Sequence, residues 1–243
     1  MTTDTPPLRP DTKARLEQVS VATLATALFK RGLRHQVIQD VHPVAHKGRN
    51  MVGPAFTLRY MPAREDRNTL AEFRNPLHPQ RHAIETCPAG HVLVMDSRKD
   101  ARQASAGDIL LTRLMVRGGA GVVTDGGFRD AMKIAELDMP VYHHRPASPT
   151  NLTNNEAIDI NVPIGCGDAP VFPGDIVVGD ADSVIIIPAH LADEVAAEAV
   201  EMTAYEDFVA EQVRAGATII GLYPATLEEN LAKFADWRKA NNR

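Results

Sequence analysis

The spacing of apolar positions predicts a series of helices along the chain. In residues 11–30, apolar side chains recur at roughly helical intervals, and Ser20 can divide this segment into two short helices. Gly32 then provides a stop signal. The further segments with helical spacing are residues 108–117, 128–137, 190–215 and 227–238.

Short apolar runs predict strands, and in the middle of the chain they alternate with these helices. The runs there cover residues 56–60, 91–96, 121–125 and 140–143. This alternation indicates an α/β layering. From residue 159 to residue 187, strand candidates follow one another through glycine and proline turns, of which Pro173-Gly174-Asp175 is the clearest. The fold is therefore predicted to be mixed.

Three segments are predicted to be irregular. Gly53-Pro54-Ala55 predicts a turn that leads into the first long strand. Residues 61–81 are polar and proline-containing, which predicts a long loop or lid. Residues 1–10 predict a poorly ordered tail. We expect one domain over residues 11–220 and a helical extension over residues 221–243.

Composition and charge exclude several classes of protein. Of the 243 residues, 44% are hydrophobic and 23% are charged, as in ordinary soluble globular proteins. A net charge of -5 argues against a nucleic-acid-binding surface. Cys87 and Cys166 lie far apart, and no apolar run resembles a signal peptide or a membrane span. We therefore expect a cytoplasmic protein with no nucleic-acid or membrane partner.

Candidate chemistry gathers where strands or loops lead into helices. The backbone N–H groups at the helix start after Gly107 attract a carboxylate. Gly126-Gly127 permits a sharp turn and admits a ligand close to the backbone, and Arg129 and Asp130 follow in the first turn of the next predicted helix. A guanidinium suits carboxylate or enolate oxygens, and a carboxylate with waters suits Mg²⁺ or Mn²⁺. The residues thus indicate a metal site beside a helix start that binds a carboxylate or enolate.

Each of these residues also has a purely structural interpretation. Asp108 is typical of a helix N-cap, Asp130 of a first-turn charge, and Arg129 of a surface cation. A glycine pair after a strand is often only a turn. The nine histidines form no metal-binding spacing, and neighbours such as His143 and His144 point to opposite faces of a strand.

A resemblance to a known family rests on this stretch. Asp108, twenty intervening residues and then Arg129-Asp130 resemble the motif shared by 4-hydroxy-4-methyl-2-oxoglutarate/4-carboxy-4-hydroxy-2-oxoadipate aldolases and the RraA-like regulators of ribonuclease activity. The segments 121–127, 173–180 and 184–188 resemble further family signatures. The resemblance spans roughly residues 15–215 and implies a swivelling α/β/β/α sandwich, assembled as a homotrimer or homohexamer.

The resemblance also implies roles by position. Asp130 would hold Mg²⁺ or Mn²⁺, and Arg129 would contact the substrate and stabilise the enolate. The amides of Gly107, Asp108, Ile109 and Leu110 would bind the pyruvyl carboxylate. Asp108 would act through a water as the base of the retro-aldol step. Glu206 of a neighbouring subunit would complete the outer shell of the metal.

Two functions of different class follow from the resemblance. The first is a metal-dependent aldolase that releases pyruvate from a 4-hydroxy-2-oxo acid, with oxaloacetate decarboxylation as a side activity. The alternative is a regulator that binds a ribonuclease and catalyses nothing. Methyl transfer to a quinone is disfavoured, because the chain lacks a strand–GxGxG–helix nucleotide site near its start. The chain also continues through Gly221-Leu222-Tyr223-Pro224 into another helix, where the aldolases usually end.

Overall fold

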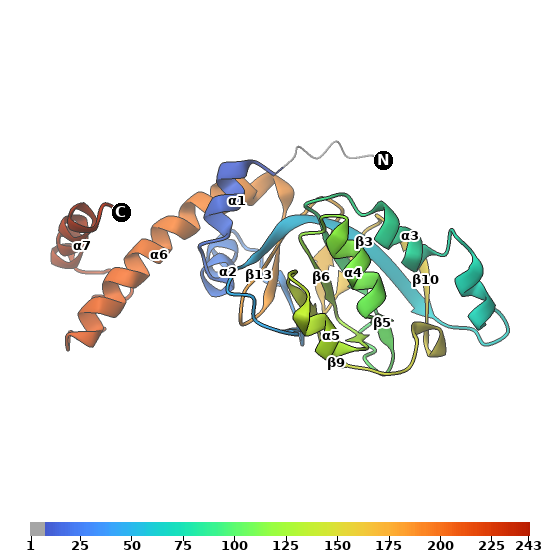
Figure 1. Ribbon diagram of the computed structural model, residues 1–243. Coiled ribbons are helices and arrows are strands. Elements are labelled where there is room, and N and C mark those ends of the chain that lie inside the picture. The colour runs from blue at the N-terminus through green and yellow to red at the C-terminus, as the bar shows by residue number, and fades with distance from the viewer. Residues whose placement is uncertain (1–7) are drawn as a thin grey trace.

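A curled sheet organises the part of the chain that the computed structural model describes, residues 8–243 (Figure 1). Residues 1–7 of the predicted tail lie outside this range, and Pro10 already begins a helix. Over this range the sheet has nine strands, with β10 (Asn155–Ile160) paired to β3 outside the main path. Along the main path the order is β1 (Val37–Ile38), β14 (Val184–Ile187), β13 (Ile176–Gly179), β3 (Met51–Pro62), β4 (Val92–Asp96), β6 (Gly121–Thr124), β8 (Val141–His143) and β2 (His42–Pro43).

The sheet has a parallel half and an antiparallel half that meet in the long strand β3. Strands β3, β4, β6 and β8 pair in parallel, whereas β13 and β14 pair antiparallel to each other and β13 pairs antiparallel to β3. Two small sheets complete the strands. They are β5 (Ala104–Ala106) with β7 (Gly127–Phe128) and β9 (Arg145–Pro146), and β11 (Ile164–Cys166) with β12 (Ala169–Val171).

Helices cover the two outer faces of the curled sheet (Figure 1). One group, beside the parallel half, comprises α3 (Pro79–Thr86), α4 (Asp108–Val116) and α5 (Ala131–Glu136). The other group comprises α1 (Pro10–Leu16), α2 (Val21–Lys30) and α6 (Ala192–Arg214). Three short 3₁₀ turns lie in connections: η1 (Leu70–Arg74), η2 (Asn151–Thr153) and η3 (Ala189–Leu191).

Three apolar clusters between the layers follow from the alternation of side chains along the strands. In β4, Leu93 and Met95 pack toward α3–α5, while Val92 and Val94 pack into the space between the two halves of the sheet. In β14, Ile185 and Ile187 pack against α1, α2 and α6, whereas Val184 and Ile186 face the central cluster. The two halves of the curled sheet form two layers, with a layer of helices outside each half. This arrangement confirms the predicted mixed α/β sandwich.

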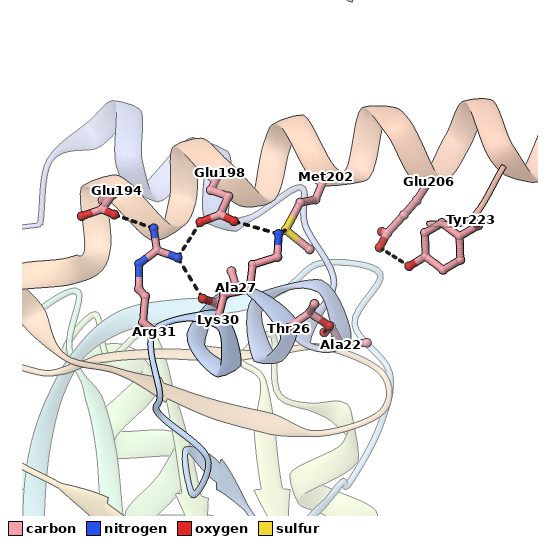
Figure 2. Close-up of polar contacts among 10 residues, drawn as sticks. All are labelled: Ala22, Thr26, Ala27, Lys30, Arg31, Glu194, Glu198, Met202, Glu206 and Tyr223. Atoms are coloured by element: carbon pink, nitrogen blue, oxygen red, sulfur yellow. Dashed lines mark hydrogen bonds and ion pairs between the residues drawn. The ribbon is translucent and has the colours of Figure 1, made fainter. Parts of the chain in front are cut away.

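The predicted division of residues 11–30 into two helices is confirmed. Ser20 is the N-cap of α2, where its hydroxyl accepts a hydrogen bond from the backbone N–H of Thr23 at 3.1 Å. Figure 2 shows how the end of α2 is tied to α6: Arg31 contacts Glu194 at 2.6 Å and Glu198 at 2.5 Å, and Lys30 contacts Glu198 at 2.9 Å. Packing of α2 on the first turns of α6 fixes the direction of this long helix.

The last part of α6 extends away from the sheet, and α7 (Glu228–Asn241) packs against it (Figure 1). Phe208 and Leu222 are buried there, with Phe234 and Trp237 packed against them. Trp237 is a packing residue, and its indole N–H donates to Glu211 at 2.7 Å. The domain boundary at residue 220 stays a prediction.

Two predicted elements are wrong in detail. Gly53-Pro54-Ala55 forms no turn, because β3 runs through it, and a side chain at Gly53 would lie 2.4 Å from the backbone oxygen of Gly90. The helix predicted over residues 128–137 is shorter, since Gly127-Phe128 pairs with β5 and β9 before α5 starts.

No helix within residues 8–243 is both long and apolar enough to cross a membrane.

Candidate active site

The predicted site residues converge on Gly107, the N-cap of α4. A Cβ atom at this position would lie 2.9 Å from Nε of Arg129 and 3.1 Å from Oδ2 of Asp130. Both side chains therefore lie directly against the start of α4. Any side chain at residue 107 would meet them at less than an ordinary van der Waals distance, so glycine is needed here for close approach.

Pairing of β5 with β7 explains this convergence. The backbone N–H of Arg129 donates to the backbone oxygen of Ala106 at 3.1 Å, which joins the residue after β7 to the residue before Gly107. Asp130 then takes a left-handed conformation, with φ 59° and ψ 37°, as the N-cap of α5. The prediction that Arg129 and Asp130 lie in the first turn of α5 is thus wrong by a residue or two, because the turn precedes the helix.

The start of α4 offers free backbone donors. Asp108, Ile109 and Leu110 form the first turn, whose N–H groups have no partner within the helix, and no side chain caps it. The first intrahelical bond runs from the N–H of Leu111 to the backbone oxygen of Gly107, at 3.2 Å. The positive end of the helix dipole acts at the same place, so the geometry suits a carboxylate.

Asp108 is held ionised by a lysine that the sequence interpretation missed. Desolvation acts to raise its pKa, but hydrogen bonding with Lys133, the backbone N–H of Ile109 and the charge of Lys133 outweigh it, so the pKa of Asp108 lies below its ordinary value. Nζ of Lys133 lies 3.4 Å from Oδ2 of Asp108. Lys133 follows Asp130 by three residues on α5, a spacing that could have revealed it in the sequence.

Arg129 and Asp130 form a second, looser pair at the mouth of the site. Nε of Arg129 lies 3.4 Å from Oδ2 of Asp130, and the two side chains are 50% and 39% exposed. Asp108, by contrast, is only 20% exposed. Oδ2 of Asp130 would lie 3.1 Å from a Cβ atom at Gly107, the residue before Asp108, so both carboxyl groups lie at the same helix start.

This pair of carboxyl groups fits a hard divalent cation. Asp108 and Asp130 supply oxygen atoms only, which are the ligands that Mg²⁺ and Mn²⁺ take in proteins, and the exposure of Asp130 leaves room for waters. No group of three or more His, Cys, Asp or Glu side chains in residues 8–243 could enclose a metal ion. A cation here would consequently depend on water and ligand oxygens for its remaining positions.

The site opens into a cavity of ≈ 460 Å³. Gly107, Asp108, Ile109, Leu110 and Arg129 form part of its wall. Further residues of the wall come from the predicted lid, from α3 and from the region of η2, namely Leu70, Phe73, Gln80, Arg81, Thr150 and Asn151. Sequence reasoning missed Gln80, Thr150 and Asn151, because nothing in their local pattern brings them to the start of α4.

Gly126 and Gly127 do not admit a ligand, contrary to the prediction. A side chain at Gly126 would lie 2.6 Å from Cβ of Ser97, and one at Gly127 would lie 2.5 Å from Cβ of Ala147. Both glycines are buried and neither lines the cavity. Their small size serves close packing of the chain behind the site.

Glu206 lies apart from these residues within one chain. It is on α6, where its carboxylate accepts a hydrogen bond from Thr23 at 2.9 Å. Figure 2 shows its second hydrogen bond, from the hydroxyl of Tyr223, at 3.2 Å. It contributes no atom to the cavity wall. Its predicted role requires a second subunit and stays a prediction.

Comparisons with known proteins point to one family. The family model described as "RraA-like: Aldolase/RraA" matches residues 21–186, which include every site residue except Glu206. A protein of Halalkalibacterium halodurans named "Putative 4-hydroxy-4-methyl-2-oxoglutarate aldolase" is 38% identical over 110 residues, which are 44% of this chain and 50% of that protein. Three curated relatives are matched over 50%, 33% and 63% of their own lengths, so this chain spans less than two thirds of each.

Two solved structures have a similar fold. Streptomyces coelicolor RraAS2, titled an unusual member of the RNase ES inhibitor RraA protein family, is 28% identical, with a TM-score of 0.72 over 84% of this chain and 97% of that chain. An uncharacterized protein from Pseudomonas syringae pv. tomato has a TM-score of 0.75 at 22% identity, over 90% of this chain and 99% of that chain. The second likeness concerns the fold alone.

Proposed function

The chain belongs to the RraA-like (Aldolase/RraA) family, and on this premise we propose that it is a divalent-metal-dependent lyase that cleaves a 4-hydroxy-2-oxo acid and releases pyruvate. The observation that carries the proposal is the contact of Arg129 and Asp130 with the start of α4 at Gly107. It combines backbone donors, a guanidinium and the carboxyl group of Asp108 at the wall of one cavity, with the carboxyl group of Asp130 beside Arg129.

Substrate binding uses the carboxylate and the 2-oxo group. The N–H groups of Asp108, Ile109 and Leu110, which have no backbone partner within the helix, take the carboxylate at the positive end of α4. Arg129 lies beside them and presents a permanent positive charge to the 2-oxo oxygen. Mg²⁺ or Mn²⁺, held by Asp130 with help from Asp108, would supply further positive charge to the same oxygens.

Cleavage breaks the C3–C4 bond and leaves its electron pair on the pyruvyl part as an enolate. Arg129 stabilises the negative oxygen that develops, because its charge is in place before the reaction begins. The proton of the C4 hydroxyl passes through a water to Asp108, which Lys133 keeps ionised. Return of a proton to C3 gives pyruvate and regenerates the carboxylate. Oxaloacetate loses CO₂ to give the same enolate, so its decarboxylation is expected as a side activity.

A second candidate is a protein-binding regulator of ribonuclease activity. The similarity to RraAS2 over nearly the whole length of that chain favours it. This function requires a partner surface and makes no use of the free donors at α4. The two candidates therefore differ in whether the isolated protein releases pyruvate.

The proposed activity is tested by pyruvate release from 4-hydroxy-4-methyl-2-oxoglutarate. The purified protein is treated with excess EDTA, dialysed, and assayed before and after addition of Mg²⁺ or Mn²⁺. We expect no pyruvate after chelation and recovery with either cation. Full turnover in excess chelator contradicts the metal dependence, and no turnover under any condition favours the regulator.

We further propose a homotrimer or homohexamer in which Glu206 reaches the site of a neighbouring subunit. Large apolar side chains on α2 and around the α6–α7 connection support assembly, because they are well exposed in the single chain. These are Phe29, Val213, Ile219, Ile220, Tyr223, Leu227 and Leu231.

A further inference from the structure

Three buried hydroxyl groups form a closed ring behind the candidate active site. Ser97 follows β4, Ser105 lies in β5, and Thr124 ends β6. The hydroxyl oxygens are 2.5 Å apart between Ser97 and Ser105, 2.9 Å between Ser105 and Thr124, and 3.1 Å between Ser97 and Thr124. The three residues are at most 2% exposed. Each hydroxyl of this hydroxyl ring can donate to the next, which satisfies all three donors without solvent.

The hydroxyl ring leaves room only for a glycine at residue 126. A Cβ atom there would lie 2.6 Å from Cβ of Ser97 and 2.9 Å from the hydroxyl oxygens of both Ser97 and Ser105. The backbone N–H of Gly126 also donates to the hydroxyl of Thr124, at 3.0 Å. The ring therefore holds the start of the segment that leads from β6 through β7 to Arg129.

Ser105 connects the hydroxyl ring to the start of α4. It lies two residues before Gly107, the N-cap of that helix. Its backbone oxygen accepts hydrogen bonds from the hydroxyl of Tyr60 at 3.0 Å and from Nε2 of Gln80 at 2.5 Å, and both donors come from buried residues. The chain just before Gly107 is thus held at a side chain and at a backbone atom.

We propose that the hydroxyl ring is a positioning device for catalysis, because it fixes Arg129 relative to the start of α4. The inference rests on the proposed function, in which the start of α4 binds the carboxylate and Arg129 stabilises the enolate. Ser105 leads to the first of these groups and Thr124 to the second, and their hydroxyls meet in the ring. No ring residue lines the cavity, so the ring acts through Gly107 and Arg129 and not on the substrate itself.

The test removes one hydroxyl and keeps the shape of the side chain. Thr124→Val leaves the backbone N–H of Gly126 and one ring hydroxyl without an acceptor. We expect kcat for pyruvate release from 4-hydroxy-4-methyl-2-oxoglutarate at saturating Mg²⁺ to fall by about 10- to 100-fold, since a misplacement of about 1 Å can cost 100-fold. KM should change much less, because the backbone donors of α4 that bind the carboxylate remain.

Two matched variants separate positioning from loss of stability. Thr57→Val makes the same exchange at another buried threonine, whose hydroxyl donates to the backbone oxygen of Val162 at 2.5 Å. It removes a buried hydrogen bond away from the cavity wall and should leave kcat unchanged. Thr124→Ser keeps the hydroxyl and loses only the methyl group, so it should restore most of the lost kcat. If Thr124→Val does not fold, Ser105→Ala removes a ring hydroxyl without adding an atom and should show the same loss of kcat.

The outcomes distinguish this inference from the proposed function. Near-native kcat in Thr124→Val and Ser105→Ala overturns the positioning role while the proposed activity stands. Equal losses of kcat in Thr57→Val and Thr124→Val, or no recovery in Thr124→Ser, also overturn it, because the effect would then follow stability or packing. If the wild type releases no pyruvate with Mg²⁺ or Mn²⁺, the proposed function fails, and the positioning role fails with it.

Discussion

Replacement of Gly107 by alanine tests the geometry of the site with a single methyl group. The new Cβ would lie 2.9 Å from Nε and 3.0 Å from Cγ of Arg129, and 3.1 Å from Oδ2 of Asp130. Ordinary contacts start at about 3.4 Å, so Arg129 must move by roughly 0.5 Å and Asp130 by roughly 0.3 Å. A misplacement of about 1 Å can cost 100-fold in rate, so we expect kcat/KM to fall by about 10- to 100-fold.

The same substitution should have little effect on stability. The backbone at Gly107, with φ -131° and ψ -179°, is allowed for alanine. Loss of unfolded-state freedom stabilises by about 0.4–1 kcal/mol, and the poorer N-cap costs a similar amount. The free energy of unfolding should therefore change by less than about 1 kcal/mol.

The assay measures pyruvate release and urea unfolding on the same preparations. Gly165→Ala is the matched control, because a Cβ there meets no atom within 4 Å. Near-native kcat/KM in Gly107→Ala, equal to that of the control, would refute the claim that the contact of Arg129 and Asp130 with α4 matters for function.

Three further predictions concern the metal, the buried acid Asp125 and assembly. Asp130→Asn should weaken Mn²⁺ binding in a titration while the fold persists, because asparagine accepts the left-handed backbone; the exposed Asp236→Asn is the control, and equal Mn²⁺ affinity in both contradicts the assignment. Burial raises the pKa of Asp125 to about 6 from 3.8, so its contribution to stability is full below pH 3.8 and is lost as the pH rises through 6. The wild type should lose about 3 kcal/mol more than Asp125→Asn between pH 3.5 and pH 7 in denaturant unfolding, and parallel curves would contradict this. Light scattering at micromolar concentration should give a trimer or hexamer, and a monomer would remove the case for Glu206.

Local pattern predicted much of the fold. The helical spacing in α1, α2, α4 and α6 and the apolar runs of β4, β6, β13 and β14 each reflect burial of one or both faces, which periodicity records directly. The continuous passage of β3 through Gly53-Pro54 was not predictable in this way. There the glycine serves close approach of the backbone of Gly90, and a distant contact overrides local turn preference.

The site was predictable only where it is continuous in sequence. Gly107 and Asp108 at a helix start, and Arg129-Asp130 before the next helix, were found from the sequence. Their meeting depends on the pairing of β5 with β7, which no local pattern shows. For the same reason the contribution of Gln80 and Asn151 to the cavity wall became evident only in the folded chain.

The most direct test of the proposed function is oxaloacetate decarboxylation at saturating Mg²⁺ by the wild type, Arg129→Lys and Arg129→Ala. Loss of a preorganised donor to an oxyanion costs about 2.7–4 kcal/mol, so kcat should fall by about 100-fold or more in Arg129→Ala. Arg129→Lys keeps the charge and loses the planar fork, and we expect it to be impaired in kcat and more strongly in kcat/KM. Near-native rates in both variants would show that Arg129 is a surface cation and would contradict the proposed function.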